Sequence, residues 1–567
     1  MVRQLLLALC CLCAAWMPGT VPLASAQTAK LAAVRPVSSC NDLAGVDLAS
    51  FTGGPTTLSA TQISGSSPYC LVTGTIDPAI RFEVHLPMNG WTQRYLQTGC
   101  GGLCGDLRIN AGHAQGCAPV TDGAIVVAST DMGHQGNDMG WGDDLQKRKD
   151  FAERGVHATA MAAKALIHVF YGQAARYSYF TGCSDGGREA LIEAQRYPGD
   201  FNGIAAGAPA MAFAAQNSFH HTWLARANTD VQGQAILLAA DLAPLHEAAL
   251  KACDGLDGLV DGQITDPRAC HVDPGTILCK GAYEPGQCLT SAKVETARLI
   301  YQGARDENGK PLEIGATMPG SELNWVGVFV PATAQGRTMS GMIAMQAVNH
   351  LLFAPNPVSP WTVQTFPFTE AMAQKETEAR KLYNADDANL APFAAYDGKL
   401  ILYHGWADPH ISPLVTLDYF HRVGIAMTPA KRDAMLRLFL LPGMAHCSGG
   451  DGPSEFPLLA TLMNWVEGGA APQMVIATRA TKTREGQPVG ITAAPAQPVD
   501  RRIPPNELGF GAADGPVQDA DPVEEAAAHP TQPALPPRSR PIYAWPQVAV
   551  YKGSGSVDDA ANFTAKH

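Results

Sequence analysis

After its first residues, the sequence contains no apolar run long enough to cross a membrane. A bilayer-spanning helix needs ~18 or more apolar residues, and the run Leu5–Trp16 is shorter. Positive charge is also scarce, because 40 lysines and arginines face 52 acidic residues and the formal net charge is −12. This balance argues against nucleic acids and anionic membranes as partners. The sequence shows no internal repeat and suggests no obligate protein partner.

The first residues have the pattern of an export signal. Arg3 supplies a positive charge, Leu5–Trp16 is the apolar segment, and Ala24-Ser25-Ala26 is a small-residue cleavage site before Gln27. We therefore predict a signal peptide over residues 1–26. The mature chain is expected to be exported, to a periplasm or to the outside of the cell.

Cysteine is well represented in this mature chain, which keeps 11 of the 14 cysteines. An exported chain is expected to oxidise them. Cys100, Cys104 and Cys117 form a cluster in which one cysteine should stay unpaired, and we predict the pair Cys104–Cys117. Short separations along the chain suggest three further pairs: Cys40–Cys70, Cys253–Cys270 and Cys279–Cys288.

Apolar segments of strand length alternate with helical patterns in two parts of the chain. This alternation predicts an α/β fold with a doubly wound, mostly parallel sheet. The expected strands are Phe82–Leu86, Tyr95–Thr98, Ala124–Ser129, Tyr177–Thr181, Ile204–Ala210 with its turn, Lys399–His404 and Leu436–Leu441, and the expected helices are Ala160–Phe170 and Glu189–Arg196.

The alternation lapses from Met211 to Ala391, and we interpret this segment as an inserted lid domain. The sheet domain would then consist of residues 27–210 and 392–567. Within the second part, Gly511–Pro537 is rich in Ala, Pro, Asp and Glu, a composition that predicts a mobile loop.

The string Gly182-Cys183-Ser184-Asp185-Gly186 matches the G-x-S-x-G pattern of a nucleophile elbow. In such an elbow a sharp strand-to-helix turn exposes the serine hydroxyl, and the neighbouring residues must be small. The alternative is a chance match to a short glycine motif. However, this string follows an expected strand and opens an expected helix, so we predict that Ser184 is a nucleophile.

Asp408 and His446 are the predicted partners of this serine. Each follows an expected strand, and the chain order Ser, Asp, His is the one expected for an α/β-hydrolase. His446 would act as the base and Asp408 would orient it. Cys183 precedes the serine and Cys447 follows the histidine, so a Ser184–His446 pair would bring the two sulfurs within bridging distance.

Other roles are open to these residues and their neighbours. Asp408 alone could be a turn or capping aspartate, and a single histidine is most often structural. His404 and His410 are rival functional histidines, which we interpret as structural or site-lining.

Main-chain amides are the expected donors to the oxyanion of the reaction. One is the amide of Asp185, directly after the nucleophile. The other belongs to the turn Gly99–Gly102, where spacing does not decide between Gly101 and Gly102. A tight turn that needs glycine for positive φ is the alternative interpretation, and both can hold together.

The loop Asp254–Gly262 carries Asp254, Asp257 and Asp261 among glycines. Three carboxylates at this spacing suit Ca²⁺, a hard cation that prefers oxygen ligands. The loop is not an EF-hand, because leucine stands at the third position and no glutamate closes it. The alternative is a solvated acidic loop, and a Cys253–Cys270 disulfide would favour the metal.

Together these residues resemble the tannase and feruloyl esterase family of α/β-hydrolases, over nearly the whole mature chain. The most specific likeness is the combination of Cys183-Ser184 with His446-Cys447. In that family the corresponding cysteines form a disulfide beneath the catalytic triad, so the resemblance implies the same disulfide here. His404–Asp408 resembles the family's acid motif, and Asp131–His134 resembles another of its signatures.

The resemblance implies a structural calcium site in the lid. Its ligands would be the carboxylates of Asp254, Asp257 and Asp261 and the carbonyl oxygens of Leu259 and Gln263. One departure is visible near the C-terminus, where members often carry a last disulfide. The corresponding strings here are Pro541-Ile542-Tyr543 and Phe563-Thr564-Ala565, which lack cysteine.

The resemblance also implies an exported serine esterase that hydrolyses aromatic carboxylic esters through an acyl-enzyme. Feruloyl or other hydroxycinnamoyl esters are favoured, with galloyl esters next. Mono(2-hydroxyethyl) terephthalate is the alternative substrate. Two alternatives belong to other classes of protein. One is an inactive polyphenol- or carbohydrate-binding protein, against which the intact Ser, Asp and His argue. The other is a calcium-dependent structural or adhesion module.

The lid is expected to determine the specificity for the acyl group of the ester. A terephthalate monoester carries a carboxylate that an arginine would bind, and nothing marks Arg337 or His350 for that role. Several lid aromatics could stack on an aryl ring, although most are expected to form lid core: Trp325, Phe329, Phe353, Trp361, Phe366 and Phe368.

Overall fold

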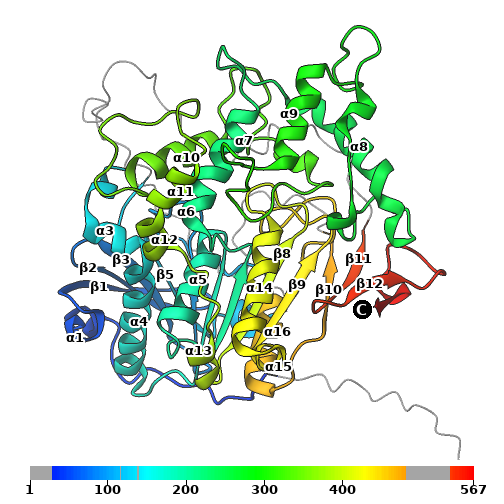
Figure 1. Cartoon of the computed structure of the whole chain (residues 1–567). Coiled ribbons are helices and arrows are strands. Elements are labelled where there is room, and N and C mark those ends of the chain that lie inside the picture. Colours follow the sequence, from blue (N-terminus) through cyan, green and yellow to red (C-terminus); the bar gives the residue numbers. More distant parts are fainter. Residues whose placement is uncertain (1–27, 115, 137–138, 480–536, 567) are drawn as a thin grey trace, which may run out of the picture.

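A nine-stranded sheet runs through the centre of the protein (Figure 1). The structure is a computed structural model that describes residues 28–114, 116–136, 139–479 and 537–566. The order of the strands is β1-β2-β3-β5-β4-β6-β7-β8-β9. They comprise β1 (Thr56–Ile63), β2 (Tyr69–Ile76), β3 (Ile80–Pro87), β4 (Arg94–Thr98), β5 (Val126–Thr130), β6 (Tyr177–Cys183), β7 (Gly203–Gly207), β8 (Lys399–Gly405) and β9 (Leu436–Leu441).

The predicted fold class is confirmed. The strands from β5 through β4, β6, β7 and β8 to β9 pair in parallel, whereas β1, β2, β3 and β5 pair antiparallel. All seven predicted strands overlap strands of this sheet. The prediction omitted β1 and β2, which form an edge hairpin whose alternating half-exposed residues carry a weaker apolar signal.

Helices cover both faces of the sheet. On β8, Leu400 and Leu402 pack into the core beneath α4 (Gly155–Tyr171), α5 (Asp185–Arg196) and α14 (Pro413–Met427). Ile401 and Tyr403 point to the opposite core, which α2 (Ala118–Thr121) and α16 (Leu458–Gly468) complete. Because adjacent residues of a strand face opposite sides, a strand buried on both faces is apolar throughout. The remaining helices of the sheet domain are α1 (Ala49–Thr52), α3 (Leu145–Lys149) and α15 (Pro429–Met435).

The segment between β7 and β8 lies above one end of the sheet (Figure 1). It adds no strand to the sheet within the described residues, and it has a core of its own around Trp325, Leu245 and Val330. None of the described helices combines the length and the apolar character needed to span a membrane. The helices of this lid segment are α6 (Phe213–Ala215), α7 (His221–Ala227), α8 (Leu242–Cys253), α9 (Ser291–Gln302), α10 (Met339–His350), α11 (Glu370–Lys375), α12 (Thr377–Tyr383) and α13 (Ala391–Ala395).

Two small antiparallel sheets of two strands each lie in the C-terminal part of the described chain. They pair β10 (Met474–Thr478) with β11 (Ser539–Tyr543), and β12 (Val548–Tyr551) with β13 (Phe563–Lys566). The predicted signal peptide, and the predicted loop 511–537 except for its last residue, lie outside the described residues.

The described residues contain five disulfides. Four are pairs named above: Cys40–Cys70, Cys183–Cys447, Cys253–Cys270 and Cys279–Cys288. The predicted pair Cys104–Cys117 is wrong, because Cys104 bonds to Cys100 and Cys117 stays free and buried. Cys117 lies in the core on the opposite face, with its sulfur 3.3 Å from that of Met463. Cys100 and Cys104 instead flank one turn, with Cα atoms 5.4 Å apart.

Glu376, between α11 and α12, is a buried carboxyl group whose oxygens have no hydrogen-bond partner among the described residues. Burial raises the pKa of Glu376 to about 8, although Arg380 is 3.7 Å away. The native state therefore binds a proton that the unfolded state has lost between pH ~4.5 and ~8, and its stability falls as pH rises.

We expect Glu376→Gln to remove this pH-dependent loss. The variant should match the wild type near pH 4 and exceed its stability by ~2–4 kcal/mol above pH 8, since a tenfold change in proton affinity corresponds to about 1.4 kcal/mol. Urea unfolding between pH 4 and 9 measures the difference. An identical pH dependence in both proteins would contradict the expectation.

Candidate active site

Ser184 occupies a strained turn between β6 and α5. Its backbone has φ 63° and ψ −121°, a combination that a residue with a side chain adopts only where its surroundings impose it. The amide of Ser184 donates to the carbonyl oxygen of Gly207 at 3.0 Å. A Cβ on Gly186 would lie 2.7 Å from the carbonyl oxygen of Cys100, so the turn needs glycine there. This is the geometry of a nucleophile elbow.

Asp408 and His446 come together from loops that follow β8 and β9. Nδ1 of His446 lies 2.8 Å from Oδ2 of Asp408, whose side chain is fully buried. The carboxylate accepts the Nδ1 hydrogen and leaves Nε2 as the basic nitrogen. Burial raises the pKa of Asp408, but the interactions with His446 and His404 outweigh it and hold that pKa well below its ordinary range.

His404 and His410 lie next to this pair, in agreement with the expectation that they are structural or line the site. Nε2 of His404 lies 3.0 Å from Oδ2 of Asp408, and its Nδ1 lies 2.8 Å from Oγ1 of Thr416. The ring of His410 stacks on that of His446 with centroids 4.4 Å apart. Burial, and after it the neighbouring His446, lower the pKa of His410 to about 3, so this ring is neutral.

The disulfide Cys183–Cys447 joins the residue before Ser184 to the residue after His446. Their Cα atoms are 5.9 Å apart, and 264 positions separate them in the sequence. Within the described part of the chain, the Ser184 hydroxyl makes no hydrogen bond to the imidazole. Such bonds are often long without substrate and tighten in the Michaelis complex. The disulfide therefore keeps Ser184 and His446 near each other independently of that hydrogen bond.

Removing this disulfide is expected to affect rate and stability together. We expect Cys183→Ser/Cys447→Ser to lower kcat for an aryl ester about 10- to 100-fold by loosening the Ser184–His446 geometry. Stability should fall by ~2–4 kcal/mol. The matched control Cys279→Ser/Cys288→Ser opens a lid disulfide and should keep kcat. Equal rates in the wild type and the first variant would show that the bridge does not maintain the site.

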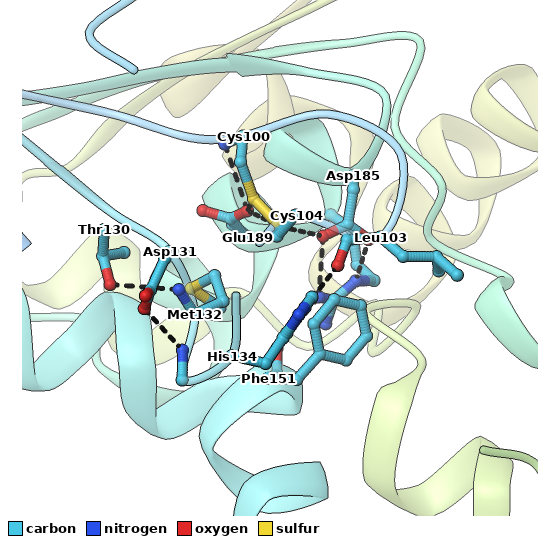
Figure 2. Close-up of a disulfide and its surroundings, with 12 residues drawn as sticks. Cys100, Leu103, Cys104, Thr130, Asp131, Met132, His134, Phe151, Asp185 and Glu189 are labelled. Carbon is cyan, nitrogen blue, oxygen red and sulfur yellow. Dashed lines mark hydrogen bonds and ion pairs between the residues drawn. A yellow bond between two sulfur atoms is a disulfide. The ribbon is translucent and has the colours of Figure 1, made fainter. Parts of the chain in front are cut away.

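The two predicted oxyanion elements lie against each other. Asp185 is the first residue of α5, where a main-chain N–H has no partner within the helix. The turn that carries Gly101 and Gly102 packs on the same helix, because Cys100 contacts Glu189 one turn further along α5 (Figure 2). The amides of Gly101 and Gly102 donate to no acceptor in the described part of the chain. Both remain candidates for the second donor.

Two lid histidines near this site were not predicted. Nδ1 of His220 lies 2.5 Å from Oε2 of Glu313, and His221 contacts Ser340. Burial lowers the pKa of His220, but Glu313 outweighs that effect and leaves it raised, whereas burial and then His220 hold the pKa of His221 well below its ordinary value. The signal in the sequence was the adjacent pair His220-His221 itself.

A sequence profile described as "Tannase and feruloyl esterase" matches residues 65–566. The chain belongs to the tannase and feruloyl esterase family. As a member, it is a carboxylic ester hydrolase.

Among curated relatives, the mono(2-hydroxyethyl) terephthalate hydrolase of Piscinibacter sakaiensis is 31% identical over 85% of this chain and 81% of its own. A probable feruloyl esterase B-2 of Aspergillus terreus is 31% identical over 74% of this chain and 80% of its own. An uncharacterized esterase of Xanthomonas campestris pv. campestris is 29% identical over 93% of this chain and 91% of its own.

Solved structures support the fold. Feruloyl esterase B from Aspergillus oryzae is similar with a TM-score of 0.68 and 24% identity, covering 95% of this chain and 98% of its own. A tannin acyl hydrolase from Aspergillus niger is similar with a TM-score of 0.63 and 19% identity over 90% of each chain.

Three of the six candidate lid aromatics lie in the core of this esterase. Trp325, Phe329 and Phe366 are fully buried, and the rings of Trp325 and Phe329 are 5.2 Å apart. The other three are partly buried against the main core: Phe353, Trp361 and Phe368. Among the six aromatics, only these three have surface left for a ligand.

The acidic lid loop is held by its own polar contacts. Oδ1 and Oδ2 of Asp254 accept from the amides of Asp261 and Gly262 at 3.1 and 2.9 Å. Oδ2 of Asp261 lies 2.5 Å from Nη2 of Arg540, on β11. Oxygen-only donors suit calcium in kind. However, no three acidic groups of this loop place ligand atoms within 4.8 Å of one another in the described structure.

Proposed function

We propose that this chain is an exported serine esterase that cleaves aromatic carboxylic esters through an acyl-enzyme. The observation that carries the proposal is the Asp408–His446 contact of 2.8 Å, tied by the Cys183–Cys447 disulfide to a serine in an elbow conformation. A serine hydroxyl needs such a base to become a nucleophile.

In the first half-reaction, Oγ of Ser184 attacks the ester carbonyl carbon while Nε2 of His446 removes its proton. Asp408 stabilises the resulting imidazolium through Nδ1. The amide of Asp185 and the amide of Gly101 or Gly102 donate to the oxyanion. The tetrahedral intermediate then collapses, and the alcohol leaves with the proton from His446.

In the second half-reaction, water attacks the acyl-enzyme. His446 removes a proton from the water, the carbonyl oxygen again becomes an oxyanion, and Ser184 leaves with that proton. The aromatic acid is released and the free serine is restored. The neutral ring of His410 packs on His446 without adding a second positive charge beside the imidazolium.

We favour feruloyl or other hydroxycinnamoyl esters, then galloyl esters, over a terephthalate monoester. The guanidinium of Arg226, in the lid, donates hydrogen bonds to the carbonyl oxygens of Val363 and Phe366. Arg337 is exposed. Arg226 is therefore not free to be the bidentate partner that a substrate carboxylate would need, and no contact places Arg337 at the catalytic residues within the described part of the chain. The similarity to a mono(2-hydroxyethyl) terephthalate hydrolase keeps that ester as the second candidate.

A hydrolysis panel tests the proposal. Methyl ferulate, methyl gallate and mono(2-hydroxyethyl) terephthalate are compared by kcat/KM, and we expect methyl ferulate to rank first. A fluorophosphonate probe should label the wild type, since only an activated serine reacts. No labelling and no turnover would favour the inactive binding protein instead.

We also propose that the loop Asp254–Gln263 binds calcium as a structural ion. The carboxylates of Asp254, Asp257 and Asp261 and the carbonyl oxygens of Leu259 and Gln263 would hold it. Asp261 forms an ion pair with Arg540 in this structure. Binding would therefore require Asp261 to release Arg540 before it could coordinate the ion. The ion would cross-link the lid loop, and it has no part in the ester chemistry.

Chelation tests this site. We expect calcium at 100 times its Kd to stabilise the wild type by about 2.7 kcal/mol over a sample in EDTA. Asp254→Asn should abolish the effect, whereas Asp273→Asn, in an exposed lid turn, should keep it. A melting temperature independent of calcium would mean that Arg540 and Arg538 neutralise Asp261 without an ion.

A further inference from the structure

We propose that Glu189, which the catalytic steps above do not use, is a positioning residue for the loop that supplies the second oxyanion donor. The inference rests on the proposed esterase function, which gives the loop Gly99–Cys104 its role. The disulfide Cys100–Cys104 and the imidazole of His134 act with Glu189. Figure 2 shows all of these groups around the same loop.

The disulfide closes the loop at both ends. Cys100 and Cys104 are bonded, and the amide of Cys104 donates to the carbonyl oxygen of Gly101 at 3.0 Å. Gly101 and Gly102 are exposed and have free amides among the described residues. The central part of the loop therefore has little to fix it, and its position depends on what holds its ends.

Glu189 holds the first end of the loop. It is fully buried on α5, one turn after Asp185. Its Oε1 accepts a hydrogen bond from the amide of Cys100 at 3.2 Å and lies 3.5 Å from Sγ of Cys104. That sulfur also lies 3.5 Å from Oδ2 of Asp185. The helix that carries one oxyanion donor thus directly contacts the loop that carries the other.

Glu189 suits this position as a neutral carboxylic acid. Burial, and after it the negative charge of Asp185, raise the pKa of Glu189 well above its ordinary value. The carboxylate of Asp185 is paired with Arg188, whose Nε and Nη2 lie 2.7 and 3.0 Å from its oxygens. A negative charge near the developing oxyanion would destabilise it. A neutral acid can hold the loop without adding such a charge.

His134 holds the loop from the other side. Its Nε2 lies 2.6 Å from the carbonyl oxygen of Leu103. Burial lowers the pKa of His134, so the ring is neutral and Nε2 carries the hydrogen that Leu103 accepts. The main chain continues this contact, because the amide of Gly105 donates to Asp131 and the amide of Gly136 donates to Gly105. Residues of the Asp131–His134 motif therefore contact the end of the loop Gly99–Cys104.

Oxyanion donors accelerate the reaction only if they are in place before charge develops. Without the acceptor on Glu189, the loop would keep its disulfide, its contact with His134 and the contact of Cys104 with Asp185, but the amide of Cys100 would lose its hydrogen bond to α5. Its amides would then move relative to Ser184. The lid, which is expected to bind the acyl group, would be untouched, so the loss should appear in kcat and not in KM.

Variants of two buried glutamates on α5 test the proposal. Glu189→Gln keeps an oxygen acceptor for the amide of Cys100 and adds no charge, so kcat should stay within about threefold. Glu189→Leu removes the acceptor and should lower kcat about 10- to 100-fold. Glu193 is equally buried one turn further along but lies beside Asp200. The matched control Glu193→Leu should therefore keep kcat.

Hydrogen–deuterium exchange tests the positioning without any substrate. The amides of Cys100 and Cys104 should exchange faster in Glu189→Leu than in the wild type, Glu189→Gln or Glu193→Leu. If Glu189→Leu does not fold, Cys100→Ser/Cys104→Ser opens the same loop and should show the same two changes.

Three outcomes would overturn the proposal: unchanged exchange in the loop, faster exchange with unchanged kcat, or an equal loss of kcat in the two leucine variants. If the wild type hydrolyses no ester, the proposed function fails, and the exchange result still decides whether Glu189 positions the loop.

Discussion

Ser184→Ala is expected to lower kcat for an aryl ester by roughly 10⁴- to 10⁶-fold, the range seen when a serine nucleophile is lost. Alanine has no oxygen that could attack the carbonyl carbon or carry the acyl group. The methyl group occupies less space than the hydroxymethyl group, so the elbow should stay intact. Initial rates with methyl ferulate measure the effect, and circular dichroism checks the fold.

A serine close to the site provides the control for this change. Ser448 follows Cys447 and is exposed, so Ser448→Ala should keep both turnover and labelling by a fluorophosphonate. Turnover by Ser184→Ala in a sample free of other esterases would refute the assignment of the nucleophile.

Asp408→Asn is expected to lower kcat about 10³- to 10⁴-fold. The amide can donate a hydrogen to Nδ1 of His446, which favours the wrong tautomer, and it offers no charge to stabilise the imidazolium. KM should change little, because the side chain of Asp408 is fully buried and contacts His446. The pH–rate profile and kcat of the variant measure the effect.

The same substitution should also destabilise the fold, since His404 and His446 both rely on this carboxylate. The pKa of Asp408 lies below its ordinary value in the folded state. Its contribution to stability is therefore present above pH ~4 and is lost as pH falls further. Asp397→Asn, at an exposed residue before β8, is the matched control. Equal kcat values for the Asp408→Asn and Asp397→Asn variants would contradict the assigned role of Asp408.

The elements around the catalytic residues were predictable because each leaves a local mark in the sequence. A strand buried on both faces appears as a continuous apolar run, as in Leu400–Tyr403 of β8. The elbow needs glycine at positions where a side chain would collide with main chain, as at Gly186. Disulfides between cysteines close in sequence follow from short spacing, which is why Cys253–Cys270 was predicted.

The edge strands and the cysteine cluster were less predictable. The hairpin β1–β2 is half exposed, so its apolar alternation is weak. Among Cys100, Cys104 and Cys117, spacing allows several pairs. The choice depends on which side of the sheet each sulfur reaches, and Cys117 lies in the core of the opposite face.

From the sequence alone came the fold class, the chemistry of the expected catalytic residues and their order along the chain, because backbone strain and strand burial restrict residue types locally. Only the tertiary structure decided that Asp408 serves two histidines, that His220 and His221 approach the site from the lid, and that Glu189 and His134 hold the loop of Gly101. Each of these depends on groups that are distant in sequence and meet only when the sheet and lid are packed together, and no local pattern records such a meeting.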